Sequence, residues 1–424
     1  VFPRGYVTNS LCGPSLASIL TGRHVHRHGI TGNDPLVPAA ASGAAARQKS
    51  PAFLQGRAQM VKRFQESPIL PRLLGERGYV SLQTGKWWMG DYSTGGFTEV
   101  MTKGGRHGDV GLDIGRKTLA PLTDFITRSK QSGKPFFAWY APMMPHDPHT
   151  PPERLLAKYR DKYLEGWEAM RAARFARQQK MGLTKTTLSP LEREVGPPYA
   201  FPAAIEKLGA GEITRNLPWS ELTAEQRRFH ATKMAIHAAM VDRMDQDIGR
   251  LIAQLKAMGV YENTLILFAS DNGASAEIMV RDGGHDPQAP MGSAATYLSI
   301  GPGFSSACNT PHRMHKTWVH EGGISTPLVA HWPAGITAHG ELRETPAHLV
   351  DIVPTLLELT GATKPKEWQG QPIPLAPGKS LVPAFAKDVP IARDSLWWLH
   401  EGNKALRVGD WKLVAAKDQP WSLY

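Results

Sequence analysis

The uninterrupted apolar run Thr264–Phe268 is the feature that most narrows the fold of this chain. A strand buried on both faces of a parallel sheet is apolar throughout, whereas a strand with one solvated face alternates apolar and polar residues. The chain has 424 residues, of which 41% are hydrophobic, which is enough for one large α/β domain and a smaller one. We therefore predict a doubly wound, mostly parallel sheet that is flanked by helices.

The chain divides, in our prediction, into a large domain over residues 1–375 and a small antiparallel subdomain over 376–424. The subdomain is indicated by short strands with tight turns between them, at 395–400, 405–408 and 411–415. In the large domain, the capping box Thr223–Gln226 predicts a long helix that runs to about Met258. The charged, proline-containing stretch 153–218 is interpreted as an insertion.

A cysteine stands where a helix is predicted to begin. Pro14 suits the first turn of that helix, Ser15 could supply a capping oxygen, and apolar residues then recur at helical spacing: Leu16, Ile19 and Leu20. Cys12 would lie at the positive end of the helix dipole, beside free backbone N–H groups that favour an anionic oxygen. The alternative is that Cys12 is only a small buried apolar residue.

Three predicted strands are followed by side chains that can bind ions or transfer protons. Tyr79–Gln83 runs into Lys86, Pro135–Tyr140 runs into His146, and Thr264–Phe268 runs into Asp271 and Asn272. Open α/β sheets bind ligands at the carboxyl ends of their strands, and carboxylate and amide oxygens suit hard cations. Each residue also has an ordinary structural interpretation. Lys86 could be a strand-end lysine that reaches the surface, His146 a structural histidine, and Asp271 and Asn272 part of an Asx turn.

Five segments together resemble one family. Residues 12–23 resemble the sulfatase signature, Cys-x-Pro-Ser-Arg followed by Leu-Thr-Gly-Arg, and residues 85–90 resemble the family's Gly-Lys-Trp-His-Leu-Gly segment. Residues 146–148 resemble its strand-end His-x-Pro motif, 270–273 its Ser-Asp-Asn-Gly motif and 316–323 its Lys-x4-Glu-Gly-Gly segment. The chain is thus identified as a sulfatase-like member of the alkaline phosphatase superfamily, and the resemblance implies that fold.

The resemblance also implies a reaction, the hydrolysis of sulfate monoesters. In this family the cysteine is oxidised by a maturation enzyme to formylglycine, and its aldehyde hydrate is the nucleophile, so Cys12 would have that role. Lys86 and Lys316 would contact the sulfate group, and His146 would assist proton transfer. The matched residues imply a calcium ion, bound by Asp271, Asn272 and the modified residue 12.

This sequence departs from the family's pattern in three places. Leu16 replaces the arginine of the signature, beside the nucleophile and within the maturation signal. Trp88 replaces a histidine, and a sugar or aryl ring could stack on it instead. The chain also has no Asp-Asp pair, which supplies half of the calcium ligands in the family. We interpret this last departure as truncation at both ends, with natural loss as the alternative, and expect weak calcium binding.

Weaker candidates for contact with the substrate come from loops and motif edges. They are Trp88, His149, His285, Arg23, His107 and Arg281. The net charge of +11 favours an anionic substrate, and no nucleic-acid-binding motif is present. The two cysteines leave no disulfide framework if Cys12 is catalytic, and no apolar run is long enough to cross a membrane.

The substrate class and two other functions stay open at this point. The tryptophans near Lys86 favour a sulfated carbohydrate over a simple aryl sulfate. The first alternative function is a phosphate or phosphonate monoester hydrolase on the same scaffold, because a calcium and lysine clamp does not inherently reject phosphorus. The second is a non-catalytic sulfatase-like binding protein. The family also suggests a periplasmic or extracellular location for the whole protein.

Overall fold

A computed structural model describes the chain from residue 1 to 424 except residues 38–43, 103–112, 147–148, 281–283, 369 and 374–376. It contains two compact units, and each is described by itself. Unit 1 comprises residues 1–142, 254–271 and 326–393, and unit 2 comprises residues 143–253, 272–325 and 394–424.

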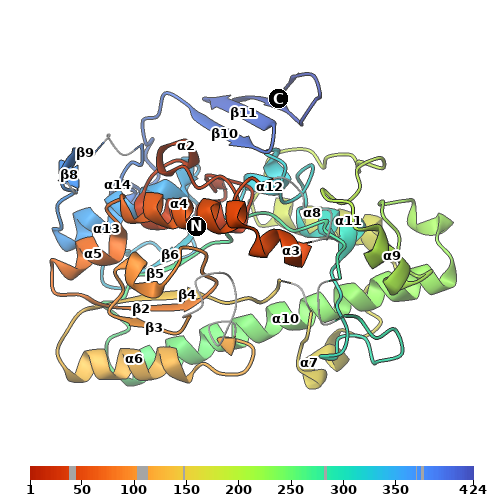
Figure 1. Cartoon of the computed structure of the whole chain (residues 1–424), viewed down its shortest axis with the longest axis horizontal. Coiled ribbons are helices and arrows are strands. Elements are labelled where there is room, and N and C mark those ends of the chain that lie inside the picture. The colour runs from red at the N-terminus through yellow and green to blue at the C-terminus, as the bar shows by residue number, and fades with distance from the viewer. Residues whose placement is uncertain (38–43, 103–112, 147–148, 281–283, 369, 374–376) are drawn as a thin grey trace. The chain divides into compact units, whose positions relative to one another are not determined.

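Unit 1 contains a parallel sheet of three strands in the order β3-β2-β4. The strands are β2 (Val80–Gly85), β3 (Glu99–Val100) and β4 (Phe136–Ala141). Helices α5 (Leu70–Gly75) and α6 (Ala120–Gln131) pack against this sheet, one on each side (Figure 1). This layering, together with a C-terminal antiparallel sheet in unit 2, confirms the predicted fold class.

The other strands of unit 1 form pairs. β1 (Gly5–Tyr6) is parallel to β7 (Ala347–His348), and β8 (Glu367–Trp368) forms a hairpin with β9 (Gln371–Pro372). β5 (Ile266–Phe268) pairs with β6 (Val329–His331) in the antiparallel direction, and Phe268 is 45% exposed. The prediction of a parallel, doubly buried strand at 264–268 is therefore wrong, because an apolar run does not fix the direction of the neighbouring strand.

The helices of unit 1 complete its core. Besides α5 and α6 they are α1 (Cys12–Thr21), α2 (Val25–His28), α3 (Ala44–Lys49), α4 (Pro51–Gln65), α13 (Ile352–Thr360) and α14 (Val382–Ala386), with 3-10 turns η1 (Tyr92–Gly95) and η4 (Leu349–Asp351). Leu70 and Leu73 of α5 pack with Val353 and Leu357 of α13 in one buried cluster. Helix α1 also contacts α13, so the helix that begins at Cys12 is anchored in this core.

Unit 2 is mainly helical. Its helices are α7 (Glu153–Tyr159), α8 (Gly166–Lys180), α9 (Pro202–Leu208), α11 (Gly301–Cys308) and α12 (Glu321–Ile324), with the 3-10 turn η3 (Trp219–Glu221) and most of α10 (Ala224–Ala257). The ring of Trp167 is fully buried, with its centroid 4.7 Å from Trp219 and 5.6 Å from Phe304. The stretch 153–218 thus contributes Trp167 to the core of unit 2, and its interpretation as an insertion stays a prediction.

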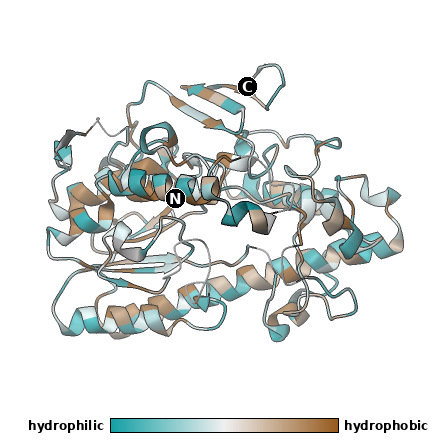
Figure 2. Cartoon of the chain, in the orientation of Figure 1, coloured by the Kyte–Doolittle hydropathy of each residue, from teal (hydrophilic) through white to brown (hydrophobic). Residues whose placement is uncertain are grey.

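Two other expectations for unit 2 are confirmed. The capping box forms as predicted, because Thr223 N–H donates to Gln226 Oε1 at 3.0 Å and Gln226 N–H donates to Thr223 Oγ1 at 3.1 Å. Helix α10 then carries hydrophilic and hydrophobic residues along its length (Figure 2). The C-terminal strands form one antiparallel sheet of β10 (Leu396–His400), β11 (Asn403–Val408), β12 (Trp411–Ala415) and β13 (Ser422–Leu423). The domain boundary at residue 375 stays a prediction.

Candidate active site

Cys12 is the first residue of helix α1, and its side chain is fully buried. Leu11 occupies the N-cap position with an extended backbone and no side-chain cap, so the prediction that Ser15 supplies a capping oxygen is wrong. The N–H of Gly13 donates instead to Asn33 Oδ1 at 2.6 Å. The expected position of Cys12 at the positive end of a helix is confirmed, and Asn33 is a partner that the sequence did not single out.

Lys86 brings a positive charge to Cys12. Its Nζ lies 3.9 Å from Cys12 Sγ and 3.5 Å from Asp271 Oδ2, and the residue is only 7% exposed. Unit 1 therefore gathers three of the predicted site residues, one from the start of a helix and two from beyond the ends of strands. A buried cation next to a buried cysteine and a carboxylate is an arrangement that stabilises negative charge.

The backbone around Gly85 explains why Lys86 points to this place. Gly85 is the last residue of β2, has φ +76°, and lies opposite Ala141 of β4. A Cβ at position 85 would lie 1.7 Å from the carbonyl oxygen of Ala141, so only glycine permits this close approach. Lys86 N–H then donates to the same oxygen at 2.9 Å. The glycine before the lysine thus fixes the direction in which the chain leaves the sheet.

The side chains of Asp271 and Asn272 are of the type that binds calcium, but two residues supply too few ligands. Both supply hard oxygen atoms, and the Asn272 Nδ2 donates to Gly273 O at 2.9 Å, which leaves the amide oxygen as its ligand atom. Calcium takes about six to eight oxygen ligands. Among the residues that the structure describes, no group of three or more His, Cys, Asp or Glu side chains could hold a metal ion.

Lys316 of unit 2 is held by an acid that the sequence analysis missed. Its Nζ donates to Glu277 Oε2 at 2.9 Å, and both residues are buried. Ser275 Oγ donates to the same carboxylate oxygen at 2.8 Å, and Lys316 N–H donates to Ala274 O at 3.0 Å. Glu277 lies close after the Ser-Asp-Asn-Gly motif, but no local pattern distinguishes it from an ordinary loop acid.

Close packing of glycines in unit 2 joins the Lys316 turn to Gly273. A Cβ at Gly323 would lie 1.9 Å from Trp318 O, and a Cβ at Gly322 would lie 2.1 Å from Met314 O. Gly273 N–H donates to Gly323 O at 3.0 Å, and a Cβ at Gly273 would lie 1.7 Å from Gly322 O. The spacing from Lys316 to the Glu-Gly-Gly sequence therefore reflects a tight turn that sits directly on the segment after Asn272.

The C-terminal sheet supports the same turn. Lys412 of β12 is buried, and its Nζ donates to Glu321 Oε1 at 2.7 Å and to Val319 O at 3.0 Å. Burial alone would raise the pKa of Glu321, but the charge of Lys412 and further cations bring this pKa down to about 2. The glutamate of the motif thus anchors the Lys316 turn to β12.

The predicted histidines lie in loops of unit 2. His146 follows β4 and sits in a turn, where its N–H donates to Met143 O at 2.6 Å. His149 is buried, with its ring 5.3 Å from that of His237, and its N–H donates to Leu298 O at 3.3 Å. His285 Nδ1 accepts from Tyr297 N–H at 3.0 Å, and burial lowers its pKa. These backbone contacts position the loops, while the catalytic and substrate roles stay predictions.

The tryptophans after Lys86 are both buried. Trp87 packs edge-on against Phe64 and Phe97, with centroid distances of 5.7 and 5.9 Å, so it is a core residue. Trp88 is 3% exposed, and its carbonyl oxygen accepts from Arg57. A sugar could stack on Trp88 only if the ring became uncovered, and this role stays a prediction. His107, Arg281 and residues 147–148 of the His-x-Pro motif lie outside the described residues.

Arg23 lies away from the predicted nucleophile. It follows the C-terminal end of α1, whereas Cys12 begins this helix of 10 residues, which is about 15 Å long at 1.5 Å per residue. Unit 1 thus brings Cys12, Lys86 and Asp271 together and leaves Arg23 at the far end of the helix. Its predicted contact with the substrate stays a prediction.

Comparisons with known proteins identify the family of this chain. The Sulfatase family model matches residues 1–362. The chain belongs to the sulfatase family. Its curated relatives include an uncharacterized sulfatase of Schizosaccharomyces pombe, 27% identical over 84% of this chain and 70% of the relative. The arylsulfatase of Klebsiella aerogenes is 30% identical over 58% of this chain, which matches about half (51%) of that enzyme's length.

Solved structures share the fold of this sulfatase-family chain. Ps i-CgsB, crystallised in complex with k-i-k-neocarrahexaose, has a TM-score of 0.60 and 20% identity, over 100% of this chain and 77% of that protein. The phosphonate monoester hydrolase SpPMH of Silicibacter pomeroyi has a TM-score of 0.57 and 19% identity, over 100% and 81%. Within the described residues, no helix is long and apolar enough to cross a membrane.

Proposed function

We propose that this chain carries the active site of a sulfuric ester hydrolase that cleaves sulfate monoesters, with residue 12 as the nucleophile. The observation that supports this most is the position of Lys86 Nζ, 3.9 Å from the buried Cys12 Sγ and 3.5 Å from Asp271 Oδ2. An ammonium group in this position suits an oxyanion better than a neutral thiol. Family membership supplies the reaction class.

Residue 12 would act after conversion of Cys12 to formylglycine by a maturation enzyme. The hydrated aldehyde of formylglycine supplies an oxygen nucleophile for attack on sulfur. The position fits this group, because the helix start and Lys86 both favour anionic oxygen. Leu16 lies one helical turn after Cys12 and is buried, so it occupies the same face of the helix as the nucleophile. The proposal therefore requires that a leucine be tolerated there.

The two lysines and His146 have the other proposed roles in the reaction. Lys86 and Lys316 would neutralise negative charge on the transferring sulfuryl group. Glu277 would hold the Lys316 ammonium in place. His146 would donate a proton to the oxygen of the departing alcohol. Asp271 and Asn272 would supply two of the oxygen ligands of a calcium ion, which needs further ligands to bind tightly.

The proposed substrate is a sulfated carbohydrate. The net charge of +11 favours an anionic ligand, and the similar protein Ps i-CgsB binds k-i-k-neocarrahexaose. The proposed partners are thus a glycan or small-molecule sulfate ester and a maturation enzyme, with a periplasmic or extracellular location for the whole protein. The sequence offers no motif for nucleic acid.

A second candidate is phosphonate or phosphate monoester hydrolysis, which the likeness to SpPMH favours. Turnover of para-nitrophenyl sulfate, phosphate and phenylphosphonate by matured protein separates the two candidates. We expect the sulfate ester to have the highest kcat/KM, and a preference for a phosphorus ester would reverse the assignment. A third possibility, a non-catalytic binding protein, is tested with Lys316→Ala. This change abolishes most turnover in an enzyme, but in a binding protein it only weakens affinity for a sulfated sugar.

A further inference from the structure

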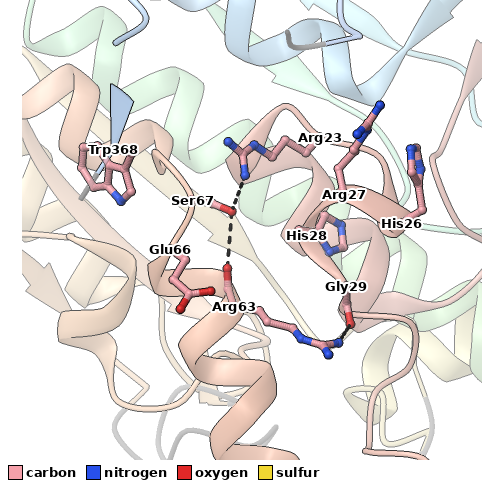
Figure 3. Close-up of a pocket in the computed structure, with 9 residues that line it drawn as sticks. All are labelled: Arg23, His26, Arg27, His28, Gly29, Arg63, Glu66, Ser67 and Trp368. Atoms are coloured by element: carbon pink, nitrogen blue, oxygen red, sulfur yellow. Dashed lines mark hydrogen bonds between the residues drawn. The ribbon is translucent and has the colours of Figure 1, made fainter. Parts of the chain in front are cut away.

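A basic pocket lies at the C-terminal end of helix α1, in unit 1 (Figure 3). Its volume is about 640 Å³, and its lining consists of Arg23, His26, Arg27, His28, Gly29, Arg63, Glu66, Ser67 and Trp368. The whole length of α1 separates it from Cys12, so it is not part of the site proposed for hydrolysis. A pocket of this volume accommodates a ligand of several connected rings rather than one small oxyanion.

Arg23 is the buried cation of this pocket. It is 8% exposed, and its Nη1 donates to Ser67 Oγ at 3.2 Å, as Figure 3 shows. Its Nε is buried and has no hydrogen-bond partner among the described residues, and no described carboxylate forms an ion pair with it. A buried charge is costly unless it is paired. Burial, and then the charge of Arg27, lower the pKa of Arg23.

Other cations add to the positive potential here. Arg27 and Arg63 are exposed, and Arg63 Nη1 donates to Gly29 O at 3.0 Å. Burial, followed by the charge of Arg23, lowers the pKa of Lys364 to about 8. Glu66 is the one carboxylate of the described lining, and its Oε1 lies 3.9 Å from Lys62 Nζ on the surface of α4. The lining therefore presents more positive than negative charge.

Trp368 gives the pocket an aromatic wall. Its Nε1 donates to Gln65 O at 3.1 Å, which fixes the indole, and the guanidinium of Arg72 lies 5.9 Å from its ring centroid. In Figure 3 the ring stands across the pocket from the helix that carries His28. An aromatic ring beside several arginines offers a flat apolar surface and charged donors together. Sugar rings that bear sulfate or carboxylate groups have both complementary features.

We propose that this pocket is a second binding site, which takes an anionic carbohydrate chain through a sulfate or carboxylate group. Arg23, Arg27 and Arg63 bind the oxyanion by charge-assisted hydrogen bonds, and Trp368 packs against a sugar ring. The chain would be held at this site independently of cleavage at residue 12. The proposal therefore does not depend on turnover, and its test reads binding.

The test is calorimetric titration of the 424-residue chain with a heparin-derived sulfated tetrasaccharide. It is done in a Lys316→Ala background, which weakens binding at the proposed catalytic site. We expect one tetrasaccharide per chain, and about tenfold weaker binding when Arg27→Gln and Arg63→Gln are combined, since each removes a charged donor. Both arginines are exposed, so the variant is expected to fold, and its thermal midpoint checks this. Arg128→Gln, an exposed arginine of α6, is the matched control and leaves affinity unchanged.

Two further measurements test whether the pocket binds a sulfated carbohydrate or a free inorganic anion. Trp368→Ala weakens tetrasaccharide binding at least about fivefold but leaves the affinity for inorganic sulfate unchanged, because only the sugar contacts the ring. Inorganic sulfate that binds as tightly as the tetrasaccharide would overturn the carbohydrate assignment in favour of a free-anion site. Equal tetrasaccharide affinity in the double arginine variant and in the control would overturn the pocket itself. The double arginine variant, with Lys316 intact, turns over para-nitrophenyl sulfate at the wild-type rate, so loss of hydrolysis and loss of this site are distinguishable.

Discussion

Replacing Lys86 with methionine tests the charge that lies beside residue 12, the proposed nucleophile. Lys86 Nζ lies 3.9 Å from Cys12 Sγ. For an oxyanion formed at the position of that sulfur, a unit charge is worth about 4 kcal/mol at an effective dielectric constant of about 20. The sulfate ester is already anionic before it reacts. If only half of this interaction energy develops on the way to the transition state, loss of the charge raises the barrier by about 2 kcal/mol, and if all of it develops, by about 4 kcal/mol. We thus expect kcat/KM to fall by between roughly 30-fold and 1000-fold.

The assay is release of para-nitrophenol from para-nitrophenyl sulfate by matured protein, with initial rates at several substrate concentrations. Methionine keeps the length of the side chain, and the thermal midpoint reports whether the buried change disturbs the fold. Lys62→Met is the matched control, because that side chain is 76% exposed and its ammonium forms, within the described residues, only a long surface pair with Glu66. A folded Lys86→Met protein whose kcat/KM stays within about threefold of the parent would refute the assigned role of this charge.

Other predictions concern unit 2 and the metal. Glu277→Gln removes the charge that holds the buried Lys316 ammonium, and we expect kcat/KM to fall about tenfold and the urea midpoint to fall as well, because the ammonium loses its charged partner. Lys412→Met leaves Glu321 without its buried partner and lowers the free energy of unfolding by about 3 kcal/mol in urea titrations. Because the folded-state pKa of Glu321 is lowered to about 2, its stabilisation is complete above pH 4.5 and is lost as pH falls from there toward 2. Acid unfolding of Lys412→Met followed by circular dichroism should lack this component, and the same acid loss in parent and variant would contradict it. Calorimetric titration with calcium should show no tight stoichiometric binding, since residues 271–272 supply two ligand atoms, and submicromolar binding would contradict this.

Much of the site in unit 1 could be predicted because each residue is fixed by local rules. The position of Cys12 follows from the start of a helix, and that of Lys86 from the end of a strand. Gly85 permits the close approach of β4, so the local sequence carries the geometry. Inference from the local sequence failed for residues 264–268, whose apolar composition predicted a buried strand with parallel neighbours. There the partner strand β6 comes from much later in the chain, and its direction depends on the tertiary fold.

The side-chain partners of Lys316 and Glu321 could not be predicted in the same way. Glu277 and Lys412 reach the Lys316 turn from distant parts of the sequence, through tertiary packing and not through a spacing rule. The glycine pair at 322–323 was recognised as a motif, but its physical reason is the contact of backbone with backbone. Arg23 shows that residues of one sequence motif can lie far apart in the structure. It belongs to the signature that contains Cys12, yet the length of a helix separates the two residues.

The central claim, that residue 12 is a matured nucleophile, is tested most directly by mass spectrometry of the tryptic peptide Gly5–Arg23. The protein is made in a host that has a formylglycine-generating enzyme, and a Leu16→Arg variant is made alongside it. The corresponding peptide of the variant ends at position 16, because trypsin cleaves after the new arginine. Our account predicts an aldehyde or its hydrate at residue 12 in both proteins. A peptide that carries only the Cys12 thiol, while the Leu16→Arg variant is converted, would contradict the account and favour a non-catalytic binding protein.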